Sequence, residues 1–360
     1  MSHRIALVLG GGGLKGFAHI GVLQALEERG VVPTLFAGTS IGSLIAASRA
    51  AGTPTATMVT HAEGLKKRDL FRLNHMGMLL ERRRAPSIYA GEPLRALIEA
   101  NVPPGTLAEL PAPVLVNTVD VQIGRQVVWG LPGLRDVSVT DAVYASCALP
   151  GFFPPGRVGD RLCIDGGTID NLPVSVVGRD CDLVIAVDTG SSDLSTSSNV
   201  GAEGFAAIYM RAATIMMHAL QQVPLERWEG PPMLLIRPRI GHIGWLSFTE
   251  TPKLIDEGYR AARAALTQLD TVLAATGGVF PRRRIAVRVD RDKCTGCAVC
   301  VHLAPDIMAL DAERKAVVLQ PSAEWSPADG EWVMQCPTGA LSARALDDDA
   351  EPAARPATAA

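Results

Sequence analysis

The sequence lacks the features that mark membrane-spanning, secreted and nucleic-acid-binding proteins. No run approaches the ~18 apolar residues that a spanning helix needs. The 34 Lys and Arg do not exceed the 37 Asp and Glu, so no nucleic-acid partner is predicted. The N-terminal apolar run, Ile5–Leu9, is too short for a signal peptide, and no A-x-A-like cleavage site follows it. We therefore expect a cytoplasmic protein, with peripheral contact at the inner membrane face as an option.

A disulfide framework is also missing. The chain has seven cysteines, an odd number, and four of them form a metal-type pattern near the C-terminal end. Cys147 and Cys163 lie in apolar surroundings, where we expect small buried hydrophobic side chains.

What the sequence does have is length and apolar content. Its 360 residues are 48% hydrophobic, which favours a globular protein with a sizeable core over a disordered chain.

The first glycine-rich stretch, Gly10–Gly16, follows Ile5–Leu9, which is predicted to be a strand buried on both faces. Gly11, Gly13 and Gly16 match G-x-G-x-x-G, the dinucleotide fingerprint. That fingerprint also needs an acidic residue about 20 positions further on, and none stands there. The other interpretation is an oxyanion hole, because consecutive glycines let backbone N–H groups turn toward one point.

The second stretch has the pattern of a nucleophile elbow. Gly38 to Gly42 reads G-T-S-I-G, with Ser40 at its centre. The apolar run Val31–Ala37 before it is predicted to be a strand, and Ile41–Ala51 after it is predicted to be a helix. We expect Ser40 at the edge of a sheet, with the N-terminus of the helix directed at it. An ordinary strand-to-helix turn is the alternative.

A carboxylate follows a third predicted strand. Asp165 is followed by Gly166 and Gly167, which form a common turn but also remove side-chain bulk beside the carboxylate. Asp165 can therefore approach another group closely. Asp188 ends the next buried strand and is the main rival as a catalytic base. His19 lies inside the first helix, where we expect a packed histidine rather than a catalytic one.

The middle of the chain leaves several alternatives open. Two basic clusters, Lys66–Arg68 and Arg82–Arg84, flank an apolar segment. They indicate either a solvated face or a surface that meets anionic lipid headgroups. Phe152 and Phe153 form an apolar corner that either lines an acyl pocket or fills the core. The Met-rich helix predicted over Phe205–Val223 favours core packing, although methionines also suit pockets that accept varied acyl chains.

The three motifs, in this order, resemble those of the patatin-like phospholipases over roughly Ile5 to Ala275. The segments Phe17–Leu23 and Ala37–Gly42 look especially like the bacterial branch related to neuropathy target esterase. The resemblance implies an α/β fold, a three-layer α/β/α sandwich around a mostly parallel sheet. It also implies a catalytic dyad in which Ser40 is the nucleophile and Asp165 the base, with no histidine.

The same resemblance implies that Gly11, Gly12 and Gly13 supply the oxyanion donors. An ordinary aspartate, with a pKa of ~3.9, is a poor base for a serine hydroxyl. Burial of Asp165 is expected to raise its pKa and improve the match. An ester has a better leaving group than an amide. The predicted reaction is therefore hydrolysis of lipid or other acyl esters, through an acyl intermediate on Ser40.

The strongest metal signal comes from Cys294, Cys297 and Cys300, spaced C-x2-C-x2-C, and from Cys336, which is followed by Pro337. Four soft thiolates suit an iron–sulfur cluster. No second cysteine trio is present, so we predict one cluster, [4Fe–4S] rather than [3Fe–4S]. Zinc is the main rival.

Residues 284–346 resemble single-cluster bacterial ferredoxins, a small α+β fold. The expected organisation is an acyl hydrolase domain over 1–276, a linker over 277–284, an iron–sulfur domain over 285–346 and a disordered tail over 347–360. The cluster serves electron transfer or redox sensing in this interpretation, with a redox partner protein. The alternative hypothesis is a redox protein whose first domain mainly binds lipid or a partner.

Overall fold

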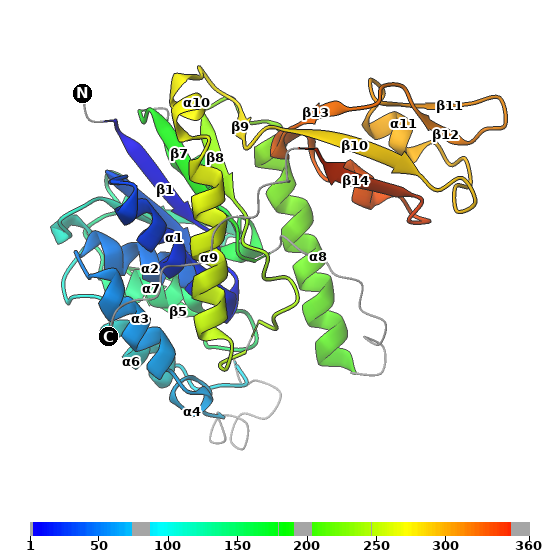
Figure 1. The fold of residues 1–360 in the computed structure, drawn as a ribbon. Coiled ribbons are helices and arrows are strands. Elements are labelled where there is room, and N and C mark those ends of the chain that lie inside the picture. The colour runs from blue at the N-terminus through cyan, green and yellow to red at the C-terminus, as the bar shows by residue number, and fades with distance from the viewer. Residues whose placement is uncertain (1–2, 74–86, 179, 191–203, 246, 347–360) are drawn as a thin grey trace.

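The computed structural model describes residues 3–73, 87–178, 180–190, 204–245 and 247–346. Its largest feature is a nine-stranded sheet in the order β5-β6-β3-β2-β1-β7-β8-β9, with β4 paired to β3 (Figure 1). The strands are β1 (Ile5–Leu9), β2 (Leu35–Thr39), β3 (Val114–Asp120), β4 (Arg125–Trp129), β5 (Gly156–Val158), β6 (Arg161–Asp165), β7 (Leu183–Val187), β8 (Met233–Ile236) and β9 (Val279–Phe280).

The sheet is mixed. The six strands from β3 to β9 in this order are parallel. At the other end, β4 and β6 pair antiparallel with β3, and β5 pairs antiparallel with β6. Side chains of β1 alternate between two cores: Leu7 and Leu9 pack on one face, and Ala6 and Val8 on the other. Burial on both faces explains why these strands read as continuous apolar runs.

Helices cover both faces, as expected for a three-layer α/β/α sandwich. The larger core contains side chains of α1, α2, α7 and α9, and the smaller one contains Leu225 near the end of α8. The helices of this part are α1 (Ala18–Glu28), α2 (Ile41–Ala50), α3 (Thr55–Gly64), α4 (Lys67–Leu70), α6 (Glu92–Glu99), α7 (Val139–Cys147), α8 (Phe205–Glu226), α9 (Thr251–Leu266) and α10 (Leu269–Ala274).

Two predicted boundaries are wrong. The strand expected over Val31–Ala37 begins only at Leu35, after Pro33, which has no N–H to donate to a neighbouring strand. The segment 277–284, expected to be a linker, contributes β9, which pairs with β8 at the edge of the large sheet. The next strand, β10, already begins at Arg283. The chain therefore passes from one sheet to the other almost without a free segment.

The C-terminal part has a sheet and a core of its own, to the right in Figure 1. Three antiparallel strands in the order β13-β10-β14 pack with a hairpin and one short helix. Trp332 and Met308 are among its buried residues. The elements are β10 (Arg283–Val289), α11 (Val299–Leu303), β11 (Met308–Leu310), β12 (Ala316–Val318), β13 (Ala323–Trp325) and β14 (Leu341–Ala345).

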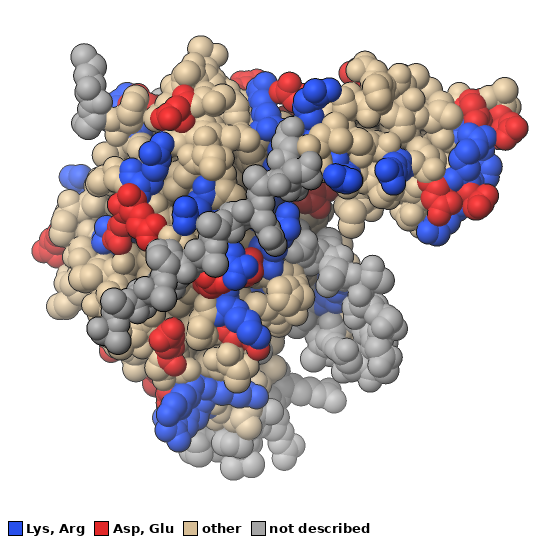
Figure 2. Space-filling model, in the orientation of Figure 1, with Lys and Arg blue, Asp and Glu red and all other residues tan. Residues whose placement is uncertain are grey.

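The basic cluster Lys66–Arg68 is exposed around α4, where Figure 2 shows blue side chains gathered on the surface. The second cluster, Arg82–Arg84, and the predicted disordered tail, 347–360, lie outside the described residues. Among the described helices, none is long and apolar enough to cross a membrane.

Candidate active site and cysteine cavity

Ser40 occupies the turn between β2 and α2 in a strained conformation, with φ 54° and ψ −130°. A positive φ at a non-glycine residue costs about 1–3 kcal/mol and persists where the surroundings enforce it. Tight packing enforces it here. A Cβ on Gly38 would lie 2.5 Å from the Gly42 backbone, and a Cβ on Gly42 would lie 2.2 Å from the Leu9 carbonyl oxygen. The steric reason inferred for these glycines from the sequence is therefore correct.

Polar side chains from two other elements hold this turn. The Ser40 N–H donates to Ser146 Oγ on α7 (2.9 Å), and Ser146 Oγ donates to the carbonyl of Asn117 on β3 (2.7 Å). The Asn117 side chain in turn donates to the Asp170 carbonyl (2.8 Å). Sequence reasoning missed Ser146 and Asn117, because no local motif surrounds either residue.

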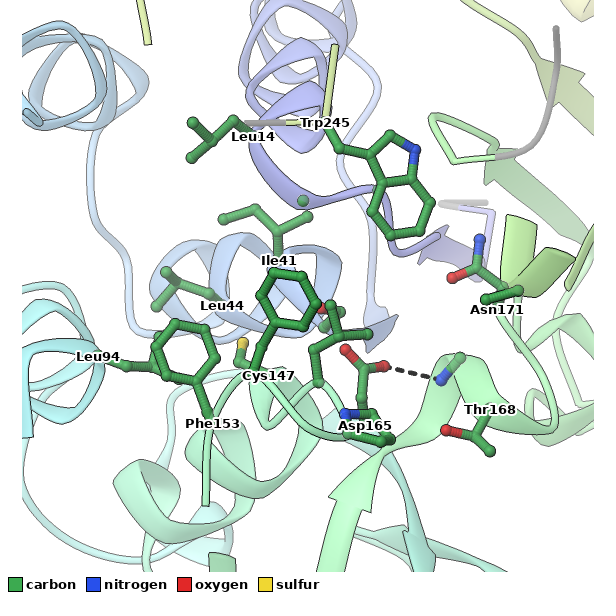
Figure 3. A pocket seen from close by; sticks show the side chains of 18 of the residues that line it. Leu14, Ile41, Leu44, Leu94, Cys147, Phe153, Asp165, Thr168, Asn171 and Trp245 are labelled. Carbon is green, nitrogen blue, oxygen red and sulfur yellow. Dashed lines mark hydrogen bonds between the residues drawn. The ribbon is translucent and has the colours of Figure 1, made fainter. Parts of the chain in front are cut away.

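Asp165 lies at the end of β6 and is only 5% exposed. Burial raises the pKa of Asp165 to about 6, although hydrogen bonds from the Ser40 side chain and the Gly167 N–H oppose the rise. The Gly167 N–H donates to Asp165 Oδ1 at 2.8 Å, the dashed line in Figure 3. The fold thus brings together the serine of the second motif and the carboxylate of the third.

The two rival residues have other partners. Asp188 is 1% exposed, and its Oδ2 lies 3.3 Å from Arg237 Nε in an ion pair. His19 is fully buried, and its Nε2 lies 2.8 Å from the Gly10 carbonyl oxygen. Burial lowers the pKa of His19 to about 4. Neither residue lines the cavity that contains Ser40 and Asp165.

The glycine loop lies directly beside the serine, since a Cβ on Gly11 would be 3.3 Å from Ser40 Cβ. Gly11 cannot supply the oxyanion donor expected of it, because its N–H donates to the Asn171 carbonyl at 3.0 Å. Gly12 and Gly13 line the cavity. Within the described part of the chain, no hydrogen bond joins the N–H of either residue to another backbone group.

A cavity of about 350 Å³ extends from this site, and its wall is mostly apolar. Phe152, Phe153 and Met217 line it, as does Met216, which is 56% exposed rather than packed in the core as predicted. Cys147 also lines the cavity, so it is not the simple core residue that the sequence indicated. Figure 3 shows Cys147, Asp165, Asn171 and Trp245 around this space. Other apolar lining residues are Leu14, Phe17, Ile41, Leu44, Leu70, Phe71, Leu94, Leu97 and Leu220.

The four C-terminal cysteines line a second, separate cavity. Cys294 and Cys300 are each 8% exposed, Cys297 is exposed and Cys336 is half-buried. Among the described residues, no three His, Cys, Asp or Glu side chains stand close enough to hold one metal ion. All four cysteines line this one cavity, and their role as cluster ligands stays a prediction.

Two of these sulfurs already accept backbone hydrogen bonds. The Ala316 N–H donates to Cys294 Sγ (3.4 Å), and the Ala340 N–H donates to Cys336 Sγ (3.3 Å). Burial raises the pKa of Cys336, but hydrogen bonds from Thr338 and Ala340 outweigh it and leave this pKa below its ordinary value. Donors of this kind stabilise thiolates, so the residues present fit an iron–sulfur cluster.

Comparison with protein families matches both parts of the chain. Residues 7–177 match the patatin-like phospholipase family, and residues 287–360 match the 4Fe-4S single cluster domain. An uncharacterized NTE family protein of Mycobacterium tuberculosis is 37% identical over 198 residues, covering 53% of this chain and 51% of the relative. A second NTE family protein of the same organism is 30% identical over 284 residues, covering 73% of this chain and 46% of the relative.

Lysophospholipase nte1 of Neosartorya fischeri is 29% identical and covers 74% of this chain, but the match spans 18% of its own length. Against the mycobacterial relatives, the chain spans about half of their length. Among solved structures, VipD from Legionella pneumophila aligns with a TM-score of 0.40 at 17% identity, over 77% of this chain and 67% of that one.

Proposed function

The chain carries a patatin-like phospholipase domain followed by a 4Fe-4S single cluster domain, and from this premise we propose that it is a serine lipid acyl hydrolase. Ser40 is the nucleophile and Asp165 its base. The observation that carries the proposal is the strained Ser40 beside a buried carboxylate, with the Gly12–Gly13 loop and an apolar cavity around them.

The chemistry proceeds in two halves. Asp165 takes the proton of Ser40 as Oγ attacks the ester carbonyl carbon, and the N–H groups of Gly12 and Gly13 stabilise the resulting oxyanion. Asp165 then returns the proton to the departing alcohol. A water molecule attacks the acyl-enzyme, Asp165 accepts its proton, and the carboxylic acid leaves as Ser40 is reprotonated.

The raised pKa of Asp165, about 6, supports this role. At neutral pH the carboxyl is still ionised, yet it binds a proton more readily than an ordinary aspartate does. One acid–base group therefore serves both halves of the reaction. The good leaving group of an ester compensates for a base weaker than histidine.

The proposed substrate is a lipid acyl ester. The cavity beside Ser40 is apolar and of the size that accommodates an acyl chain. One relative is named as a lysophospholipase, which makes lysophospholipids the first natural substrates to test. The exposed cations Lys66–Arg68 are the proposed contact with anionic headgroups at the inner, cytoplasmic membrane face.

For the C-terminal part we propose that Cys294, Cys297, Cys300 and Cys336 hold one [4Fe–4S] cluster, with [3Fe–4S] as the alternative. Such a cluster supplies one-electron chemistry when bound. The proposed domains meet between β9 and β10: the cores of the first include Val279 and Phe280, and the second, from Arg283 to residue 346, has a core of its own. Electron exchange with a redox partner, or redox sensing, is the proposed role of the second.

The test is hydrolysis of p-nitrophenyl esters of graded chain length by wild-type and Ser40→Ala protein, both purified without oxygen. We expect turnover in the wild type and none in the variant, with equal visible absorbance of the cluster as the control for folding. Wild-type protein that carries its cluster but hydrolyses no ester or lysophospholipid would overturn the proposal. That outcome favours the second candidate, a redox protein whose first domain binds lipid, because the four converging cysteines remain.

A further inference from the structure

A cleft of about 660 Å³ lies where the two parts of the chain meet. Its walls come from the end of β8, from α9, and from β10 and β13 of the C-terminal sheet, all of which meet at the junction in Figure 1. It shares no described lining residue with the apolar cavity at Ser40. Small-molecule sites have volumes of about 300–1,000 Å³, so this cleft has the size of a ligand site.

Arginine dominates the lining of this cleft. Arg237, Arg239, Arg260 and Arg283 all border it, and among the described lining residues the only carboxylate is Glu257. A guanidinium group presents a planar fork of N–H donors that matches the oxygens of a phosphate. The lining therefore favours an anionic ligand.

Two of these arginines already have carboxylate partners. Arg260 pairs with Asp256 and Glu257 on α9. Arg237 Nε lies 3.3 Å from Asp188, and its Nη1 lies 3.3 Å from Glu331. Their positive charge is offset, so the excess charge of the cleft comes from the remaining two arginines.

Arg237 nevertheless retains a donor for a ligand. Its side chain is only 18% exposed, and its Nη2 is buried without a hydrogen-bond partner among the described residues. A buried N–H without an acceptor costs about 1–3 kcal/mol. An oxygen atom of a ligand in the cleft is the acceptor that this group lacks.

An aromatic side chain borders the same space. Trp325 on β13 pairs in register with Arg283 on β10, and both residues line the cleft. The Trp325 indole N–H donates to the Gly330 carbonyl (3.0 Å), which fixes the edge of the ring. A fixed indole next to guanidinium groups suits a ligand that combines a phosphate with a planar group.

We propose that this cleft binds a small phosphorylated molecule, whose phosphate contacts Arg237, Arg239 and Arg283. The site is independent of ester hydrolysis, because it shares no residue with the Ser40 cavity. It also spans both parts of the chain, since Arg237 belongs to the first and Arg283 to the second. A bound ligand therefore ties the hydrolase-like part to the cysteine-rich part.

The test is calorimetric titration of the full, cluster-loaded chain with pyrophosphate, ADP and glycerol 3-phosphate. We expect saturable binding of pyrophosphate, weakened at least about tenfold in Arg283→Gln, because a hydrogen bond to a charged group is lost. Arg288→Gln is the matched control: Arg288 lies on the same strand, is exposed and does not line the cleft. Its affinity should equal that of the wild type.

Tighter binding of ADP than of pyrophosphate would support stacking on Trp325, and preference for glycerol 3-phosphate would identify a lipid headgroup as the source of the phosphate. Absence of saturable binding for all three probes overturns the proposal, as does an equal loss in Arg288→Gln. If Arg283→Gln does not fold, Arg239→Gln decides by the same criterion. Running the titrations in the Ser40→Ala background keeps the result separate from the proposed hydrolase function.

Discussion

Asp165→Asn should make the protein more stable at neutral pH while it abolishes hydrolysis. The pKa of Asp165 rises from 3.8 to about 6 in the folded protein because the carboxyl is buried. Each pKa unit corresponds to about 1.4 kcal/mol. Ionised Asp165 therefore lowers the free energy of unfolding by about 3 kcal/mol at pH 7, relative to the protonated form. An asparagine carries no charge into this environment.

The sign follows from proton binding. Between the two pKa values the folded chain holds a proton on Asp165 that the unfolded chain has lost, so stability falls as pH rises. The contribution of the bound proton on Asp165 to the free energy of unfolding is fully present below pH 3.8 and is lost as pH passes through about 6. The free energy of unfolding of Asp165→Asn minus that of the wild type should grow with pH. About half of this growth should occur between pH 5 and pH 7.5.

The assay is urea unfolding of cluster-loaded wild type and Asp165→Asn across that range of pH. Asp160→Asn is the control, because Asp160 is exposed on the turn just before β6, and its difference from wild type should stay constant. A pH-independent difference for Asp165→Asn, or a variant that is less stable at pH 7.5, refutes the argument that burial controls this carboxyl. Hydrolysis by the wild type should fall as pH drops through about 6.

Three further substitutions test other parts of the two sites. Gly42→Ala should lower the free energy of unfolding by about 1–3 kcal/mol, because the new Cβ would lie 2.2 Å from the Leu9 carbonyl oxygen; urea unfolding measures this. Ser146→Ala removes the acceptor of the Ser40 N–H, so we expect a loss of about 1–3 kcal/mol and a lower kcat with little change in KM. Cys336→Ala should abolish the visible absorbance of the reconstituted cluster, and hydrolysis by the same preparation shows whether the cluster affects the first domain.

Local patterns were enough to predict the parts of the site that are themselves local. The elbow at Ser40 needs only a strand, a tight turn and a helix in succession, and the steric role of Gly38 and Gly42 followed from that arrangement. The cysteine trio at 294–300 is close together for the same reason, with Cys294 and Cys297 just before α11 and Cys300 in its first turn. In each case the residues that interact are near neighbours in the chain.

Contacts between distant segments could not be predicted from such patterns. Ser146 reaches Ser40 across 106 positions, and the Gly11 N–H meets a carbonyl of Asn171, 160 positions away. The oxyanion role of Gly11 was therefore assigned wrongly, since a glycine-rich loop shows that amides can turn but not which of them already has an acceptor. For a related reason the sequence left two roles open for Met216, core packing and an acyl pocket, and the structure places it at the cavity. An apolar helix shows that it packs, but not which of its faces borders a cavity.

The proposed Ser40–Asp165 pair uses no histidine, and burial explains why His19 is unsuited to the role of base. His19 is the histidine nearest to the glycine loop in sequence, but it is fully buried with its Nε2 against the Gly10 carbonyl oxygen. Its pKa of about 4 makes it a weaker base at neutral pH than a carboxylate whose pKa is about 6. Burial thus acts in opposite directions on the two residues: it weakens the histidine and strengthens Asp165. The carboxylate beside Ser40 is the better base of the two, which is why we assign the proton transfer to Asp165 alone.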